Sequence, residues 1–95
     1  MDEWDKALVA YESALRHNPN SPKTLHALAR LLLEREQFGP AIEVFQRLMG
    51  LGNNGNREEI LSEMALSWIG MEDLGKAAAF IQKAIQIGKE EASIG

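Results

Sequence analysis

The chain has 95 residues, a charged share of 25 % and a formal net charge of −4, which indicate one small globular domain without the basic surface of a nucleic-acid binder. It contains no cysteine, which excludes a disulfide framework, a thiolate metal site and a cysteine nucleophile. No apolar run approaches the roughly 20 residues that span a bilayer, and the acidic start does not resemble a signal peptide. We therefore expect an intracellular chain, cytoplasmic or nuclear, that binds neither membrane nor nucleic acid directly.

Apolar residues recur with the 3.6-residue period of amphipathic helices in five stretches of the chain. These stretches begin at Trp4, Leu25, Phe38, Leu61 and Leu74. No stretch alternates between apolar and polar residues with the β-branched side chains typical of strands. The pattern predicts an all-α fold of about five helices.

Residues that begin and end helices fall between these stretches. Ser21, Asn56 and Asp73 are suited to capping amino-terminal ends, and Pro22 suits a first helical turn. Helix ends are predicted at three glycines, Gly50, Gly70 and Gly88. Gly50 is expected to adopt the left-handed backbone conformation. Residues 89–95 are expected to form a short frayed tail.

A pattern of small and large residues repeats along the chain with a period near 34 residues. The spacing of Ala7, Tyr11 and Ala14 recurs at Ala41, Phe45 and Leu48, and again at Ala77, Ile81 and Ala84. The period and the pattern resemble the tetratricopeptide repeat family, whose unit is a pair of helices. The resemblance implies an antiparallel helix-pair solenoid of two and a half repeats over residues 1–88. The units would be the second helix of a truncated repeat (1–20) and two full repeats (21–55 and 56–88), followed by the tail (89–95).

The resemblance also implies a concave groove, lined by the first helix of each pair, in which a protein or peptide partner binds. The residues that fall on this groove are Lys23, His26, Arg30, Glu59, Ser62, Glu63, Leu66 and Ile69. The first three form a basic cluster that can receive an acidic group or a carboxyl terminus of a peptide. The alternative is a plain solvated helix face.

One use of the groove in this family is the binding of chaperone tails through a clamp of lysine, asparagine and arginine side chains. The chain offers Lys23 and Arg30 for such a clamp but no asparagine on the groove. A chaperone-tail adaptor is therefore an alternative function rather than the main prediction.

The two ends of the predicted solenoid carry apolar residues that a further repeat would cover. Trp4 and Leu8 lie at the first end, and Ile81 and Ile85 lie at the last. Because solenoid units need neighbours to cover their faces, a second prediction is a self-associating structural fragment of a longer array, including a homodimer.

Two sequence patterns match those of functional sites, but we interpret both as parts of the helical fold without that function. Residues 50–55 spell G-x-G-x-x-G, but a dinucleotide site requires a strand before the glycines, and residues 41–49 read as helix. Glu59 and Glu63 are four residues apart on one helix, yet no histidine is expected beside them, so a solvated face is favoured over a metal or acid–base pair. We predict no enzymatic activity, no cofactor and no metal.

A second, narrower resemblance concerns the segment from Ala10 to Pro19, together with Leu28, Ala29 and Phe38. This segment is similar to the tetratricopeptide subunit of fungal general transcriptional corepressors, over about 40 residues and fading after Gly50. The resemblance implies a nuclear scaffold. The main prediction is thus a non-enzymatic protein-interaction scaffold that binds a partner segment in the concave groove. A place in a transcriptional corepressor is a narrower prediction, which rests on this second resemblance alone.

Overall fold

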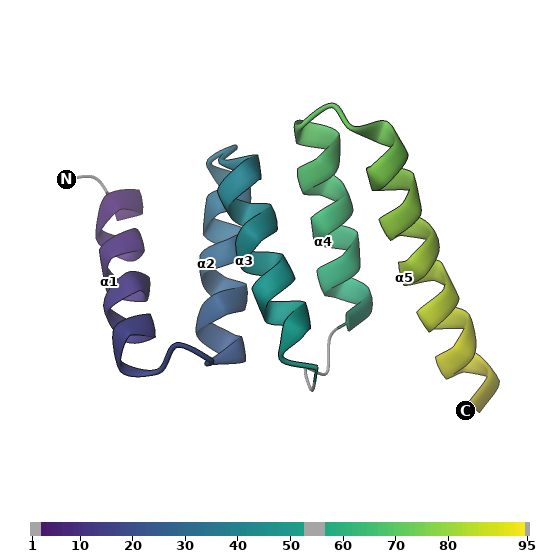
Figure 1. Ribbon diagram of the computed structural model, residues 1–95, viewed down its shortest axis with the longest axis horizontal. Helices are drawn as coiled ribbons and strands as arrows, with labels where there is room; N and C mark the ends of the chain where they lie inside the picture. Colours follow the sequence, from purple (N-terminus) through teal and green to yellow (C-terminus); the bar gives the residue numbers. More distant parts are fainter. Residues whose placement is uncertain (1–2, 53–56, 95) are drawn as a thin grey trace.

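A computed structural model describes residues 3–52 and 57–94. Within these ranges the chain is helical, with no strand. The helices are α1 (Glu3–His17), α2 (Pro22–Glu34), α3 (Phe38–Gly50), α4 (Arg57–Gly70) and α5 (Leu74–Ile94) (Figure 1). The predicted all-α class is confirmed. No helix in these ranges is long and apolar enough to cross a bilayer.

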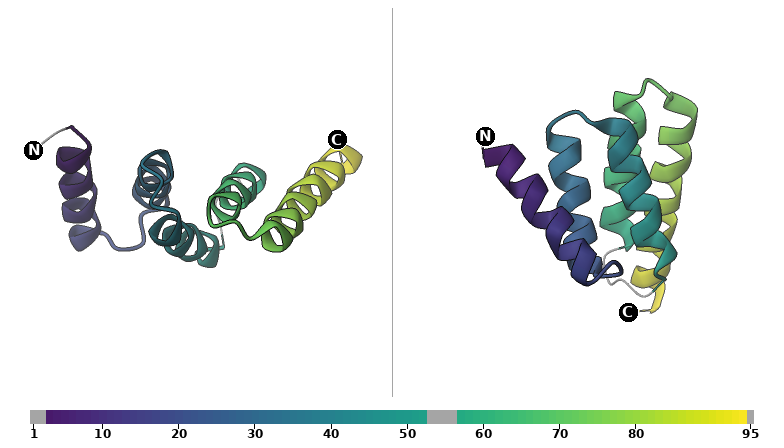
Figure 2. Two further views of the ribbon diagram at one scale, coloured as in Figure 1. Left: turned by 90° about the horizontal axis from the view of Figure 1, so that it is seen from above. Right: turned by 60° about the vertical axis from the view of Figure 1, so that its left-hand side comes forward.

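Consecutive helices run antiparallel and lie side by side in a row (Figure 1). Each helix packs against the next one in the chain, and α2 also contacts α4. Seen from above, α2 and α4 lie on one side of the row, and α3 and the first turns of α5 lie on the other (Figure 2). The result is an elongated molecule of 46 × 29 × 18 Å, in which helix pairs follow one another along one direction.

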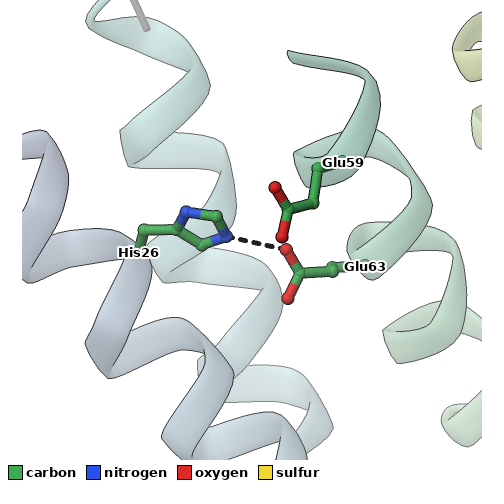
Figure 3. Close-up of side chains that lie close together, drawn as sticks. All are labelled: His26, Glu59 and Glu63. Carbon is green, nitrogen blue, oxygen red and sulfur yellow. Dashed lines mark hydrogen bonds and ion pairs between the residues drawn. The ribbon is translucent and has the colours of Figure 1, made fainter. Parts of the chain in front are cut away.

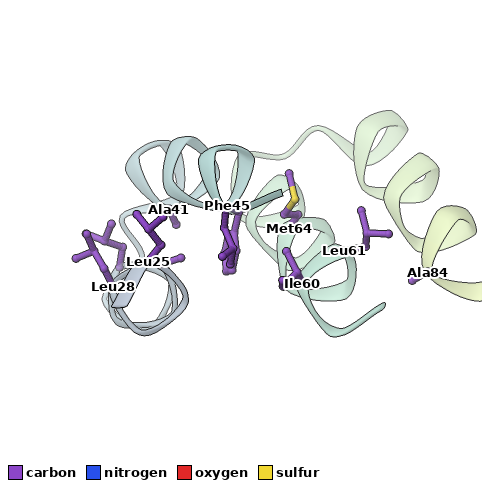
Figure 4. Close-up of a cluster of buried hydrophobic side chains, with 11 residues drawn as sticks. Leu25, Leu28, Ala41, Phe45, Ile60, Leu61, Met64 and Ala84 are labelled. Atoms are coloured by element: carbon purple, nitrogen blue, oxygen red, sulfur yellow. The ribbon is translucent and has the colours of Figure 1, made fainter. Parts of the chain in front are cut away.

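The core runs between the helices as a continuous layer of apolar side chains (Figure 4). Phe45 is its largest fully buried member, pointing from α3 into the space between α2 and α4. Small residues on the packing faces are also buried, namely Ala29, Ala41, Ala65, Ala77 and Ala84. Because alanine side chains end at Cβ, these positions allow neighbouring helices to approach closely.

Two of the predicted helix caps are present. The Ser21 hydroxyl accepts a hydrogen bond from the backbone N–H of Thr24 at 3.3 Å, and Pro22 occupies the first turn of α2. The Asp73 carboxylate accepts a hydrogen bond from the backbone N–H of Lys76 at 3.1 Å. Such side chains satisfy N–H groups that have no partner within the helix. The third predicted cap, Asn56, lies outside the described residues.

Helix α3 ends at Gly50, as predicted, but the left-handed backbone expected of Gly50 is found two residues later, at Gly52, whose φ is 79°. The predicted end at Gly88 is wrong. Helix α5 continues through Gly88 to Ile94, so residues 89–94 are helix and not a frayed tail. A glycine inside a helix costs only about 1 kcal/mol relative to alanine, and the lysine, glutamates and alanine that follow Gly88 are good helix formers. Gly88 also faces Glu58 of α4 closely, since a Cβ there would lie 3.2 Å from the Glu58 carboxylate.

Gly70, at the end of α4, lies directly against the aromatic ring of Phe38 at the start of α3. A Cβ built at Gly70 would overlap that ring. By contrast, a Cβ at Gly75 in the first turn of α5 would meet nothing closer than a carboxylate oxygen of Asp73 at 3.7 Å. Glycine is therefore required at position 70 for packing and is replaceable at position 75.

We expect Gly70→Ala to lower the free energy of unfolding by roughly 1–3 kcal/mol, because the added methyl group displaces the Phe38 ring. The matched Gly75→Ala should leave stability unchanged or raise it by up to about 1 kcal/mol, since alanine is the better helix former. Urea denaturation followed by circular dichroism measures both. Equal effects of the two substitutions would show that the Gly70–Phe38 contact is not tight.

Candidate protein-binding site

Lys23, His26 and Arg30 lie on one side of α2, since their spacing of three and four residues brings them to one helix face. Lys23 and Arg30 are exposed, and His26 is half-buried. Helix α4 lies next to α2 on the same side of the molecule (Figure 2). The two helices together therefore form one candidate binding surface, here called the α2–α4 face.

A hydrogen bond joins the two helices of this face. His26 Nε2 lies 2.7 Å from Glu63 Oε1, and the two side chains are 17 % and 13 % exposed (Figure 3). Because an ionised carboxylate only accepts hydrogen bonds, the imidazole is the donor. The imidazole also packs edge-on against Phe45, with ring centroids 6.3 Å apart and an interplanar angle of 66°. The core thus holds the His26 ring in position beside α4.

Arg30 contacts the same carboxylate from the other side. Its Nε lies 3.2 Å from Glu63 Oε2, with the Arg30 side chain 56 % exposed. Glu63 therefore already partners two of the three members of the predicted basic cluster. A clamp for a peptide carboxylate would have to compete with Glu63 for Arg30, which makes a chaperone-tail clamp a poorer fit to this surface.

Glu59 lies one helical turn before Glu63 and is exposed. One ligand atom each from His26, Glu59 and Glu63 lies within 4.8 Å of the others (Figure 3). The expectation that no histidine lies beside the two glutamates is therefore wrong. It failed because His26 is 37 residues away from Glu63 in the sequence and reaches it only through the packing of α2 on α4.

The rest of the α4 side of this surface changes from polar to apolar along the helix. Ser62 is exposed, and its hydroxyl donates to the backbone carbonyl of Glu58 at 3.0 Å. Leu66 and Ile69 follow, and they are 54 % and 45 % exposed. Large apolar side chains on a folded surface favour contact with another apolar surface, so this part of α4 is the best candidate for protein contact.

The residues expected at the two ends of the solenoid differ in exposure. Trp4 and Leu8 are half-buried and pack against the core, and the Arg35 guanidinium lies 5.0 Å from the centroid of the Trp4 ring. Ile81 and Ile85 are 42 % and 52 % exposed on α5. Of these four residues, the two at the carboxyl-terminal end are therefore the ones that are exposed to solvent.

The glycine-rich segment does not meet the requirement of a dinucleotide site. Residues Phe38–Gly50 form a helix, where that site needs a strand. The remaining glycine of the motif, Gly55, lies outside the described residues.

A shallow hollow that the sequence analysis missed lies between α3 and α5, over α4. Its volume is about 540 Å³, and its apolar lining comes from Met49, Leu61, Met64, Phe80 and Ile87. Phe80 is half-buried here against the core. Only the packing of three helices brings these residues together, so no single stretch of sequence signals the hollow.

Antiparallel helices that pack mainly on their sequence neighbours, with small residues at the contacts, define a helical-repeat protein. The sequence model of one such family, the tetratricopeptide repeat, matches residues 1–58. The chain belongs to the tetratricopeptide repeat family.

Two curated proteins are similar over most of this chain. The chain is 40 % identical over 83 residues to the general transcriptional corepressor trfA of Dictyostelium discoideum, covering 87 % of this chain and 6 % of that protein. It is 38 % identical over 84 residues to the general transcriptional corepressor ssn6 of Schizosaccharomyces pombe, covering 88 % of this chain and 7 % of that protein. The sequence analysis expected the corepressor resemblance to fade after Gly50. That expectation is wrong, because the similarity covers 83 and 84 residues of the chain.

We expect Glu63→Ala to lower the free energy of unfolding by about 1–3 kcal/mol, because it leaves the half-buried imidazole of His26 without its charged partner. Glu59→Ala removes the same type of side chain from an exposed position one turn away, and should change stability by no more than about 0.5 kcal/mol. Urea denaturation in metal-free buffer measures the free energy of unfolding of both variants. Equal losses of stability in the two would contradict a stabilising contact between α2 and α4 at Glu63.

Proposed function

We propose that the chain is a non-enzymatic protein-interaction scaffold that holds a segment of a partner protein on the α2–α4 face. The observation that carries this proposal is the exposure of Leu66 and Ile69 on α4, beside the charged groups of α2. Membership of the repeat family supports it, because stacked helix pairs create extended binding surfaces.

The proposed recognition combines apolar anchoring with charge. Leu66 and Ile69 offer the apolar area, which supplies most of the binding free energy when partner side chains cover it. The exposed Lys23 of α2 and the exposed Glu59 of α4 have opposite charges, and they set the orientation in which a partner segment lies. A partner with apolar side chains at helical or alternating spacing fits this arrangement.

The similarity to two general transcriptional corepressors supports a more specific proposal, that the partner belongs to a transcriptional repression complex. The chain spans only 6–7 % of the length of those relatives. Within such a protein it would be one of several surfaces, and its own contribution would be the recruitment of one partner.

A segment exchange tests this proposal. The part of Schizosaccharomyces pombe ssn6 that matches this chain is replaced by the chain, and repression of a reporter gene is measured. We expect the exchange to preserve repression and Leu66→Glu within it to reduce repression at least fivefold, because a charge at this position opposes apolar contact.

The matched control is Val9→Glu, which places the same charge on an exposed apolar position of α1, where the side chain is 49 % exposed. The Val9→Glu variant should repress the reporter as strongly as the exchanged protein without a substitution. Equal loss of repression in both variants, or no loss of repression with Leu66→Glu, would contradict binding on the α2–α4 face.

A second candidate function is self-association through α5. Leu74, Ile81 and Ile85 recur at helical spacing on one side of this helix, and they are 68 %, 42 % and 52 % exposed. An apolar stripe of this kind pairs readily with the same stripe of a second copy around a twofold axis. Trp4 and Leu8 contribute less to such pairing, because they are already packed against the core.

If α5 pairs with a second copy, the molar mass in solution will rise from that of a monomer to that of a dimer as concentration increases. Ile81→Lys should then raise the dissociation constant of the dimer at least tenfold. Gln82 is adjacent to Ile81 and also exposed, and Gln82→Lys should leave the dissociation constant unchanged. Sedimentation over a hundredfold range of concentration measures both variants, and a constant monomer mass of the unchanged chain would rule the pairing out.

A further inference from the structure

The cluster of His26, Glu59 and Glu63 contains more than the ion pair described above. Its three ligand atoms come from two helices and lie within 4.8 Å of one another (Figure 3). Glu59 and Glu63 are one turn apart on α4, so their carboxylates reach the same region from the same helix face. His26 enters that region from α2, with Nε2 directed at the carboxylates.

These atoms are the donor types of a transition-metal site. One imidazole nitrogen and two carboxylate oxygens are common ligands of zinc in proteins. A tetrahedral ion with bonds of about 2.0–2.1 Å separates its ligands by about 3.3–3.4 Å. The distance of 2.7 Å between His26 Nε2 and Glu63 Oε1 is shorter than this ligand–ligand distance. The distance of 4.8 Å within which all three ligand atoms lie is longer than it. Small side-chain movements bring the ligand atoms to this spacing. On binding, Nε2 also loses the proton that it donates to Glu63, and the neutral imidazole then carries its proton on Nδ1.

The charges around this point act in both directions. The two carboxylates repel each other when both are ionised, and a divalent cation between them removes that repulsion. The Arg30 guanidinium opposes a cation through its own positive charge, but it contacts Glu63 Oε2, so Oε1 is the oxygen that faces the cluster. The contact of the imidazole with Phe45 holds the nitrogen ligand in place, which lowers the entropy lost on binding.

We propose that His26, Glu59 and Glu63 bind one Zn²⁺ ion, whose remaining coordination positions face solvent. The imidazole selects zinc over magnesium and calcium, which prefer oxygen ligands. The ion links α2 of one repeat to α4 of the next, and so stiffens the α2–α4 face. This proposal shares Glu59 with the proposed partner contact, but its test needs no partner, because all three ligands lie within the chain.

Titration of the metal-free chain with zinc chloride, followed by calorimetry, tests the site. We expect one Zn²⁺ per chain. At about 100 times the dissociation constant, Zn²⁺ should raise the Tm by on the order of 10 °C, because the ion binds the folded chain only. Magnesium chloride at the same concentration should leave the Tm unchanged.

Two variants with matched controls locate the ion. His26→Ala and Glu59→Gln should each weaken zinc binding at least tenfold. His17→Ala removes the exposed histidine of α1, and Glu43→Gln removes an exposed carboxylate of α3; each should change binding less than twofold. Glu59 is exposed, so its substitution tests the site even where His26→Ala fails to fold.

Three results would overturn the proposal. The first is no zinc binding by the metal-free chain at millimolar concentration. The second is equal weakening by His17→Ala and His26→Ala, which indicates nonspecific binding to histidines. The third is unchanged binding in Glu59→Gln, which would reduce the cluster to the His26–Glu63 hydrogen bond alone.

Discussion

Close contact between neighbouring helices is the constraint on which the rest of this structure depends. The alanines on the packing faces are almost completely buried, with Ala29 and Ala41 at 0 % and Ala65 at 2 % exposure. Helix axes come within about 8–10 Å of each other depending on the side chains between them. This approach brings α2 and α4 together, and it allows His26 and Glu63 to meet across 37 residues of sequence. Larger side chains at the alanine positions would separate the two halves of the α2–α4 face.

The helices themselves could be predicted from the sequence, because the 3.6-residue period and the caps at Ser21 and Asp73 are local signals. The errors occurred at glycines. Glycine ends a helix only when the surrounding structure favours a turn there, and the lysine, glutamates and alanine after Gly88 favour helix, so α5 continues to Ile94. The close approach of Gly88 to Glu58 of α4 favours a small residue at this position, and that contact cannot be recognised from the residues around Gly88.

The candidate site was partly predictable for a similar reason. Helical spacing correctly places Lys23, His26 and Arg30 on one side of α2, because that is a property of one helix. What this side meets is a property of two helices, and the sequence analysis left the three residues available for a partner. In the folded chain Glu63 contacts His26 and Arg30, so the cluster is internal as much as it is a binding surface.

Helix α1 is attached more weakly than the other four helices. In the part of the chain that the structure describes, it packs only on α2 and has no fully buried residue. Detaching α1 therefore uncovers no fully buried side chain of its own, and we expect this opening to cost less free energy than global unfolding. Local stability measured at Trp4 in α1 and local stability measured at Trp68 in α4 are then two different quantities.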